Sequence, residues 1–210
     1  MMHRRPWQKG LPLLKVTDVV YVVHGEGVMV GVPVLQVMTA GCTFGCRFCD
    51  ADHTTGARDW NAGDKEKLYD SQARWVTLTG GEPLQQDLVQ FAAEVHNAGK
   101  LLHVETSGTV AAESAMFDFI TCSPKMPAHE LPLLRWDELK VLYHTPAQDL
   151  AQWFSADILA RFRGPDHRCL QPVERPAGSG LFNFRDTVLA VKQDPRWRLS
   201  VQVHKWLQIS

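Results

Sequence analysis

The sequence lacks long hydrophobic runs, internal repeats and any marked excess of charge. No stretch approaches the roughly 18 apolar residues that a membrane-spanning helix needs, and 22 basic residues against 23 acidic ones leave a net charge of -1. This balance gives no general attraction to nucleic acid or to a membrane surface. The N-terminal segment is basic but has no apolar run of signal-peptide length. We therefore expect a soluble, cytoplasmic protein with no nucleic-acid or membrane partner.

Cysteine is scarce and unevenly placed. The chain has five cysteines in 210 residues, and Cys42, Cys46 and Cys49 fall within eight consecutive positions. An odd number with two isolated members argues against a secreted disulfide framework. Thiolates this close together in a reducing compartment are typical of metal ligands. The isolated Cys122 and Cys169 are expected in the core, where free cysteine is usually found.

Short β-branched runs alternate with amphipathic stretches along the chain. This alternation is typical of α/β proteins with a parallel sheet, and no linker composition divides the chain. We predict one α/β domain with a mostly parallel sheet. The expected strands are Val16–Val22, Val34–Thr39, Trp75–Thr79, Leu101–Glu105, Phe119–Thr121, Glu138–Leu142, Cys169–Gln171 and Leu199–Val203.

The helices are indicated by apolar spacing and by end signals. Leu84, Leu88, Phe91 and Val95 recur at helical spacing, and the stretch ends at Gly99, as a helix C-terminus should. The remaining expected segments are a helix at Thr145–Phe154, a helix at Asn183–Gln193, a loop with a short helix at 52–71 and extended chain at 124–134.

The unusual residues follow the expected strands. In parallel α/β folds the loops after the carboxyl ends of strands gather on one face, so these motifs predict a single site. The motifs are Cys42–Asp50, Thr79–Pro83, Glu105–Gly108, Ser123–Lys125 and Gln171–Pro172.

The cysteines have the spacing C-x3-C-x2-C. Their softness suits zinc or an iron–sulfur cluster. Structural zinc needs a fourth ligand, and His53 is the nearest residue of the right type. An iron–sulfur cubane held by three cysteines leaves one iron open to a ligand.

This spacing, followed by the GGEP segment at Gly80–Pro83, resembles the radical S-adenosylmethionine superfamily. The resemblance implies an incomplete, TIM-like barrel and a 4Fe–4S cluster on Cys42, Cys46 and Cys49. Its open iron would bind S-adenosylmethionine, and reduction would release a 5′-deoxyadenosyl radical. Glycines at this position let the backbone approach a ligand, and Glu82 could receive the methionine ammonium.

Further motifs resemble the 7-carboxy-7-deazaguanine synthase family over nearly the whole chain. They are HGEG at His24–Gly27, CDADHT at Cys49–Thr54, TGGEP, ETSGT, SPK, ELKV, LQP and the terminal WRLSVQVHKWLQI. The family contracts 6-carboxy-5,6,7,8-tetrahydropterin to 7-carboxy-7-deazaguanine with loss of ammonia, for queuosine-type bases. The resemblance implies a homodimer, Mg²⁺, an electron donor such as flavodoxin, and a small-molecule pterin-like substrate.

Motif by motif, the resemblance assigns residues to two groups. The cofactor-binding residues would be Phe48, Cys49, Asp50, Gly80, Gly81, Glu82, Ser123, Pro124, Lys125, Gln171, Pro172, Val173 and Glu174. The substrate-binding residues would be His24, Gly25, Glu26, Thr79, Glu105, His204 and the terminal Ser210. Residues 1–15 would form an N-terminal extension and residues 16–210 a core domain that ends in a substrate-closing segment.

The chemistry of these side chains supports the assignment. A pterin presents an amino group and a ring N–H on one edge, and Glu26 or Glu105 could accept both hydrogen bonds. A buried carboxylate without a partner is costly, so a bound ligand is consistent with either glutamate. Lys125 and His204 could neutralise a carboxylate of the cofactor or the substrate.

Three residues depart from the family pattern. His24 stands for the family's glutamine, Met38 for an arginine that precedes the cysteines, and Ala51 for a threonine. Methionine cannot replace the bidentate grip of arginine on a carboxylate. Alanine lacks the side-chain oxygen that usually binds Mg²⁺ at this position. The metal would then bind through Asp50 or water, or it would be absent.

These departures leave several functions open. The chain is either a divergent synthase with a rearranged carboxylate site or a relative that acts on another pterin-like or purine-like substrate. An activase that installs a glycyl radical on a partner protein is a further alternative. The least enzymatic one is a simple iron–sulfur or zinc module.

Overall fold

The computed structural model describes residues 14–133, 135–144, 148–160, 167–174 and 181–208. The strands are β1 (Lys15–Val23), β2 (Pro33–Thr39), β3 (Arg58–Asp59), β4 (Trp75–Gly80), β5 (Leu101–Thr106), β6 (Phe119–Cys122), β7 (Glu138–Tyr143), β8 (His167–Pro172) and β9 (Arg198–Leu199). They form one sheet in the order β3-β1-β2-β4-β5-β6-β7-β8-β9.

Parallel pairing dominates this sheet. β1 is antiparallel to β2 and β3, and every pairing from β2 to β9 is parallel. Within the described residues no pairing joins β3 to β9, so the sheet is not closed. The predicted α/β class with a mostly parallel sheet is confirmed, and the TIM-like barrel remains a prediction.

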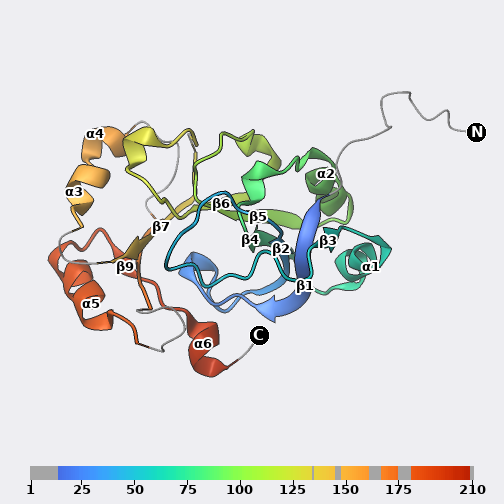
Figure 1. The fold of residues 1–210 in the computed structure, drawn as a ribbon, viewed down its shortest axis with the longest axis horizontal. Helices are drawn as coiled ribbons and strands as arrows, with labels where there is room; N and C mark the ends of the chain where they lie inside the picture. Colours follow the sequence, from blue (N-terminus) through green and yellow to red (C-terminus); the bar gives the residue numbers. More distant parts are fainter. Residues whose placement is uncertain (1–13, 134, 145–147, 161–166, 175–180, 209–210) are drawn as a thin grey trace, which may run out of the picture.

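The helices are α1 (Ala62–Asp70), α2 (Val89–Asn97), α3 (Leu150–Trp153), α4 (Ala156–Leu159), α5 (Phe184–Gln193) and α6 (Val203–Leu207). In Figure 1, α1 and α2 lie on the right, α3, α4 and α5 lie on the left, and α6 lies at the bottom of the view. α2 packs against β5, and α5 packs against β8 and β9. No helix in the described part of the chain is both long and apolar enough to cross a lipid bilayer.

The core lies along the central parallel strands. β4, β5 and β7 are buried over most of their length, as expected for strands whose two faces are both covered. α2 contributes Phe91, Ala92 and Val95 from one face. Cys122 and Cys169 are buried, as predicted.

Seven of the eight expected strands are present with bounds close to those predicted, and the eighth is wrong. The chain is extended only to Leu199, and Val203 begins α6. The N–H of Ser200 still donates to Leu170 on β8, but that of Val203 donates to Gly25. The chain therefore leaves the sheet edge and crosses toward the loop after β1.

The expected helix at Leu84–Gly99 begins later than predicted. Pro83–Gln85 forms a 3-10 turn, and α2 begins at Val89. The Glu82 carboxylate caps this turn by accepting from the N–H of Leu84, while Gln86 is extended and donates its side-chain amide to the carbonyls of two distant residues. Tertiary hydrogen bonds thus override the apolar spacing in the first turn.

Two shorter segments complete the comparison with the sequence. α1 is capped by Asn61, which forms a capping box with Asp64, and it lies within the region predicted as a loop with a short helix. Ala128–Glu130 forms a 3-10 turn inside the stretch expected to be extended. Residues 145–147 of the predicted Thr145–Phe154 helix lie outside the described residues, and α3 occupies its second half.

Candidate active site

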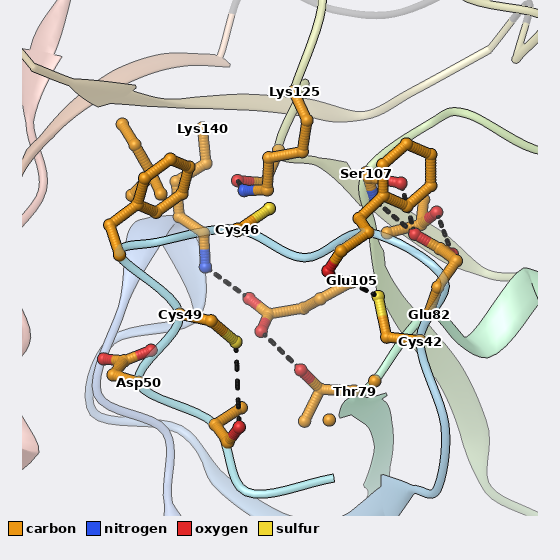
Figure 2. Close-up of a pocket in the computed structure, with 18 of the residues that line it drawn as sticks. Cys42, Cys46, Cys49, Asp50, Thr79, Glu82, Glu105, Ser107, Lys125 and Lys140 are labelled. Atoms are coloured by element: carbon orange, nitrogen blue, oxygen red, sulfur yellow. Dashed lines mark hydrogen bonds and ion pairs between the residues drawn. The ribbon is translucent and has the colours of Figure 1, made fainter.

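The three clustered cysteines lie on the loop that follows β2. All are free thiols, and all line one cavity of about 230 Å³ at the carboxyl ends of the parallel strands. Figure 2 shows the sulfur atoms of Cys42, Cys46 and Cys49 spread around the space next to Glu105. The predicted convergence of the strand-end motifs on one site is therefore observed.

The stem of the cysteine loop is fixed by the loop after β4. The N–H of Glu82 donates to the carbonyl of Gly41 at 3.1 Å, and the N–H of Gly81 donates to Thr39 at 2.9 Å. A Cβ atom on Gly81 would collide with the carbonyl of Gly41, so this close approach requires glycine. Backbone contacts therefore hold the cysteine loop against the sheet.

The donors at this cavity are the three thiols and one histidine. No three His, Cys, Asp or Glu side chains in the described ranges gather closely enough to hold one metal ion. Each iron of a cubane takes its own thiolate, so the cysteines of a cluster need only surround a common space. His53, the candidate fourth ligand for zinc, lines the cavity with a buried Nδ1 that makes no hydrogen bond to any described residue. The iron–sulfur cluster and the zinc alternative both remain predictions.

Glu82 joins two of the motifs. Its Oε1 accepts from the hydroxyl of Thr106 at 2.6 Å, and its Oε2 accepts from the N–H of Ser107 at 2.8 Å and from the Ser107 hydroxyl. Glu82 is 2% exposed, so these donors satisfy a carboxylate that would otherwise be costly to bury. Its clearest structural role is to clamp the GGEP segment to the ETSGT segment.

Lys125 brings a partly buried amine to the cavity wall. Its Nζ donates to the hydroxyl of Ser123 at 2.9 Å and lies 5.8 Å from the centre of the Phe48 ring. Burial lowers the pKa of the Lys125 amine, and a bound carboxylate would oppose that effect by favouring the charged form. Lys125 is therefore well placed to bind an anionic group of a ligand.

The cavity is also lined by a group of four residues that we call the upper layer: Glu26, Thr79, Glu105 and Lys140. The Lys140 ammonium lies 2.7 Å from Oε2 of Glu26 and 2.6 Å from Oε1 of Glu105, and Thr79 donates to Oε2 of Glu105 at 3.1 Å. Burial alone would raise the pKa of both carboxyl groups, but the charge and hydrogen bond of Lys140, together with the other polar neighbours, lower both. The two glutamates therefore remain ionised although each side chain is only 17% exposed.

A second group, the lower layer, lies beneath it on the same strands: Thr77, His103, Thr121 and Glu138. His103 Nδ1 is 3.1 Å from the Thr77 hydroxyl, and its Nε2 is 2.9 Å from the Thr121 hydroxyl. Thr121 donates its proton to Glu138 at 2.8 Å, so it accepts from His103 Nε2. Burial lowers the pKa of His103 to about 3. The ring is therefore neutral, with its proton on Nε2.

The C-terminal segment forms another wall of the site. The side-chain amide of Gln202 donates to Oε1 of Glu26 at 2.7 Å and to Oδ2 of Asp50 at 3.0 Å, and the Lys205 ammonium lies 2.6 Å from the same Asp50 oxygen. His204 packs against Gly25, where a Cβ atom would meet its ring. These contacts surround a second cavity of about 240 Å³ that shares Glu26, Asp50 and Glu105 with the first.

Most of the predicted site residues line these two cavities. Those that line the first are Cys42, Cys46, Phe48, Cys49, Asp50, Gly80, Gly81, Glu82, Ser123, Lys125, Gln171, Val173 and Glu174. His24, Gly25 and His204 line the second, and Glu26, Thr79 and Glu105 line both. Pro124 lines a separate pocket beside Phe48, Pro172 is buried at the end of β8, and Ser210 lies outside the described residues.

Three side chains at the site were not predicted: Lys140, Gln202 and Lys205. Lys140 could have been identified from the sequence, because it lies in the middle of a predicted strand and a buried lysine needs anionic partners. Gln202 and Lys205 belong to the terminal WRLSVQVHKWLQI motif, in which only His204 was assigned a role, and Gln202 fell within the predicted strand Leu199–Val203.

The structure also places the three departures from the family pattern. Met38 and Ala51 line the second cavity. His24 is buried, with Nδ1 3.0 Å from the carbonyl of Glu26 and Nε2 3.7 Å from Glu105. All three departures therefore lie near the upper layer, at the predicted substrate side of the site.

Comparison with known proteins is consistent with this geometry. No family model matches the chain. The 7-carboxy-7-deazaguanine synthase of Bacteroides thetaiotaomicron is 33% identical over 93% of this chain and 98% of its own length, and that of Burkholderia multivorans is 30% identical over 92% and 98%. The crystal structure of QueE from Escherichia coli has the same fold, with a TM-score of 0.71 at 24% identity over 91% of this chain and 94% of that one. This chain is an enzyme that belongs to the 7-carboxy-7-deazaguanine synthase family.

Proposed function

We propose that the enzyme converts 6-carboxy-5,6,7,8-tetrahydropterin to 7-carboxy-7-deazaguanine and ammonia, using S-adenosylmethionine and a 4Fe–4S cluster. One observation carries the proposal: the same cavity is lined by three free thiols and by the Glu105–Lys140 ion pair. A cofactor held by the thiols would therefore face the polar groups best suited to a pterin. The names of the curated relatives support the same reaction.

The chain's own residues supply the cofactor site in this proposal. Cys42, Cys46 and Cys49 hold the cluster as thiolates, and Lys125 binds the carboxylate of S-adenosylmethionine from the cavity wall. When bound and reduced, these cofactors supply a 5′-deoxyadenosyl radical that abstracts hydrogen from the substrate. Glu82 fixes the two loops on which the ligand rests.

The upper layer supplies the substrate site. An ionised carboxylate accepts up to four hydrogen bonds, and Glu105 uses part of that capacity on Thr79 and Lys140. The remaining capacity suits the amino edge of a pterin. The Lys140 ammonium keeps the carboxylate ionised before the substrate arrives, so binding requires no proton transfer to solvent.

The segment before and within α6 would close the site over the substrate. Gln202 bridges Glu26 and Asp50, and the N–H of Val203 donates to the carbonyl of Gly25 at 2.9 Å. These contacts join the C-terminal segment to the HGEG and cysteine loops and would keep water from the reacting centre. We include in the proposal the core domain from residue 16 onward, an electron donor such as flavodoxin, and a homodimer.

Anaerobic reconstitution tests the proposal. The enzyme is incubated with reductant, S-adenosylmethionine and 6-carboxytetrahydropterin, and the products are identified by mass. Both 5′-deoxyadenosine and 7-carboxy-7-deazaguanine are expected. If only 5′-deoxyadenosine forms, the substrate assignment fails, and the alternative of another pterin-like or purine-like substrate gains support from Met38 and Ala51 at the second cavity.

Iron loading separates the two classes of cysteine. Replacing Cys42, Cys46 or Cys49 by alanine should abolish iron binding, because each would remove one of three cluster ligands. Replacing Cys122 or Cys169 should leave the iron content unchanged, because both are buried in the sheet. Equal iron loss in both classes would mean that the effect comes from misfolding. A glycyl-radical activase is disfavoured because the C-terminal segment lines a small-molecule cavity rather than leaving an open groove.

A further inference from the structure

Lys205 holds a position beside the substrate cavity that no motif had assigned. Its ammonium lies 2.6 Å from Oδ2 of Asp50 and 3.7 Å from Oε2 of Glu174. Asp50 belongs to the cysteine loop and Lys205 to α6, so the ion pair crosses the mouth of the site. Both residues line the second cavity, together with Glu26 and Glu105 of the upper layer.

The residues beside Asp50 do not fit a Mg²⁺ ion. Mg²⁺ requires six oxygen ligands in near-octahedral geometry at about 2.0–2.1 Å. The neighbouring Ala51 has no side-chain oxygen, and Oδ2 of Asp50 already accepts hydrogen bonds from Lys205 and Gln202. Elsewhere in the described residues no three His, Cys, Asp or Glu side chains gather to hold a metal ion. A divalent cation on Asp50 would also lie next to the Lys205 ammonium and be repelled by it.

The charges around the second cavity show what the ammonium could do instead. Glu26, Glu105 and Asp50 bring negative charge to its lining, and Met38 and Ala51 bring none. Lys140 lies between Glu26 and Glu105 and is directed at those two carboxylates. Among the described residues that line this cavity, Lys205 is the one lysine or arginine. It is therefore the side chain best placed to meet an oxygen atom of a ligand there.

We propose that the ammonium of Lys205, and not a divalent metal ion, is the cation that contacts the substrate beside Asp50, so that turnover needs no Mg²⁺. This inference rests on the proposed function, since the ligand is an oxygen of the pterin-like substrate, either a ring carbonyl or a carboxylate. A primary ammonium has three donors. Asp50 accepts one hydrogen bond from Lys205 and Glu174 lies 3.7 Å away, so a donor would remain for the ligand.

The first test measures metal dependence in the reconstituted enzyme. Product formation by the wild type should be the same within about twofold in chelator and in excess Mg²⁺. The Lys205 ammonium is part of the chain, so a chelator cannot remove it as it would remove Mg²⁺. Lys205→Met should lose about tenfold or more of the rate, as expected for one charge-assisted hydrogen bond. The exposed Lys192 on α5 provides the control, and Lys192→Met should keep the wild-type rate.

The second test exchanges the ammonium for a metal site. The double variant Lys205→Met/Ala51→Thr removes the ammonium from Asp50 and adds the missing oxygen. Its rate should rise about tenfold or more with Mg²⁺, a response that a purely structural role for Lys205 would not produce. The single variant Lys205→Arg keeps a cation and should stay independent of Mg²⁺.

Mn²⁺ binding gives a readout that does not depend on turnover. The electron paramagnetic resonance signal of free Mn²⁺ is followed while the holoenzyme is titrated in the presence of 6-carboxytetrahydropterin. The wild type should remove no Mn²⁺ at this site, and the double variant should remove one equivalent. Stoichiometric Mn²⁺ binding by the wild type, or product that forms only with Mg²⁺, would overturn the inference. A wild type that makes no product and binds no Mn²⁺ would contradict the proposed function, and would leave standing only the conclusion that the residues beside Asp50 do not hold a divalent ion.

Discussion

The upper and lower layers share strands β4, β5 and β7, on which their residues lie two positions apart, and they behave in opposite ways. The upper layer carries two ionised carboxylates around a buried ammonium, whereas the lower layer is organised by a neutral imidazole. The paired positions are Thr77 and Thr79 on β4, His103 and Glu105 on β5, and Glu138 and Lys140 on β7.

The difference between the layers follows from what borders each of them. The lower layer is closed: His103 is fully buried, and both of its ring nitrogens are bonded within the layer. The upper layer borders both cavities, and its carboxylates keep acceptor capacity for a ligand. A buried polar layer can therefore serve stability or recognition, and its access to a cavity decides which.

The largest expected effect comes from removing the ammonium of the upper layer. In Lys140→Met, Glu26 and Glu105 would face each other without a cation, which should lower the free energy of unfolding by about 3–5 kcal/mol. Urea unfolding at neutral pH measures the change. The double variant Lys140→Met/Glu105→Gln removes one of the two repelling charges and should recover part of the loss. Wild-type stability in the single variant would contradict the ion-pair role.

The same isosteric change in each layer gives the sharpest contrast. Glu105→Gln removes an acceptor that faces the cavity, and product formation should fall roughly 100-fold, the equivalent of one strong charge-assisted hydrogen bond. Glu138→Gln should keep the rate within about threefold but lose roughly 1–3 kcal/mol of stability, because the Thr121 hydroxyl or the N–H of Val28 loses its acceptor. Equal rate losses in the two variants would abolish the distinction between the layers.

The pH dependence of stability tests the neutral imidazole. The pKa of His103 is lowered from 6.5 to about 3 by burial, so its contribution to stability is complete above pH 6.5 and is lost as pH falls toward 3, where only the unfolded chain binds the proton. The contribution amounts to about 1.4 kcal/mol per pH unit below 6.5. Between pH 7 and pH 5, His103→Gln should therefore lose about 2 kcal/mol less than the wild type. Parallel stability curves would show that folding does not lower the pKa of His103.

The smallest expected effect compares the two threonines of β4. Thr77→Val and Thr79→Val each remove one hydroxyl, from His103 and from Glu105 respectively, and each should cost about 1 kcal/mol of stability. Only Thr79→Val should also change the KM for the pterin, because Thr79 lines both cavities. A change in KM for Thr77→Val would mean that the lower layer communicates with the substrate site.

The parallel core could be predicted from the sequence because its strands are short β-branched runs buried on both faces. The meeting of the motifs at one site followed from the rule that loops after parallel strands share a face. Where tertiary hydrogen bonds override local pattern, prediction failed. Gln86 leaves the helical path to bond β1 and the loop after β2, and nothing in the apolar spacing encodes those partners.

The sequence predicted which residues lie at the site better than it predicted which of them contact each other. Glu26 and Glu105 were expected to face a ligand, but their shared partner Lys140 depends on the stagger of β5 against β7. Gln202 and Lys205 were not predicted to lie at the site. The chain leaves the sheet after Leu199, so the side chains that follow do not point where a continued strand would place them. Residue type and order along the chain were sufficient to locate the site, and three-dimensional register was needed to pair its charges.

The backbone hydrogen bonds between the loops after β2 and β4 affect how well the enzyme would tolerate oxygen. The hydrogen bonds from Gly81 to Thr39 and from Glu82 to Gly41 use backbone atoms alone, so the stem of the cysteine loop stays in place whether or not the thiols hold iron. Zinc fingers differ, because they unfold without their metal. If the chain holds the proposed cluster, its loss would leave a folded chain with three thiols still near one another, and a reductant with fresh iron and sulfide could rebuild it without a new round of folding.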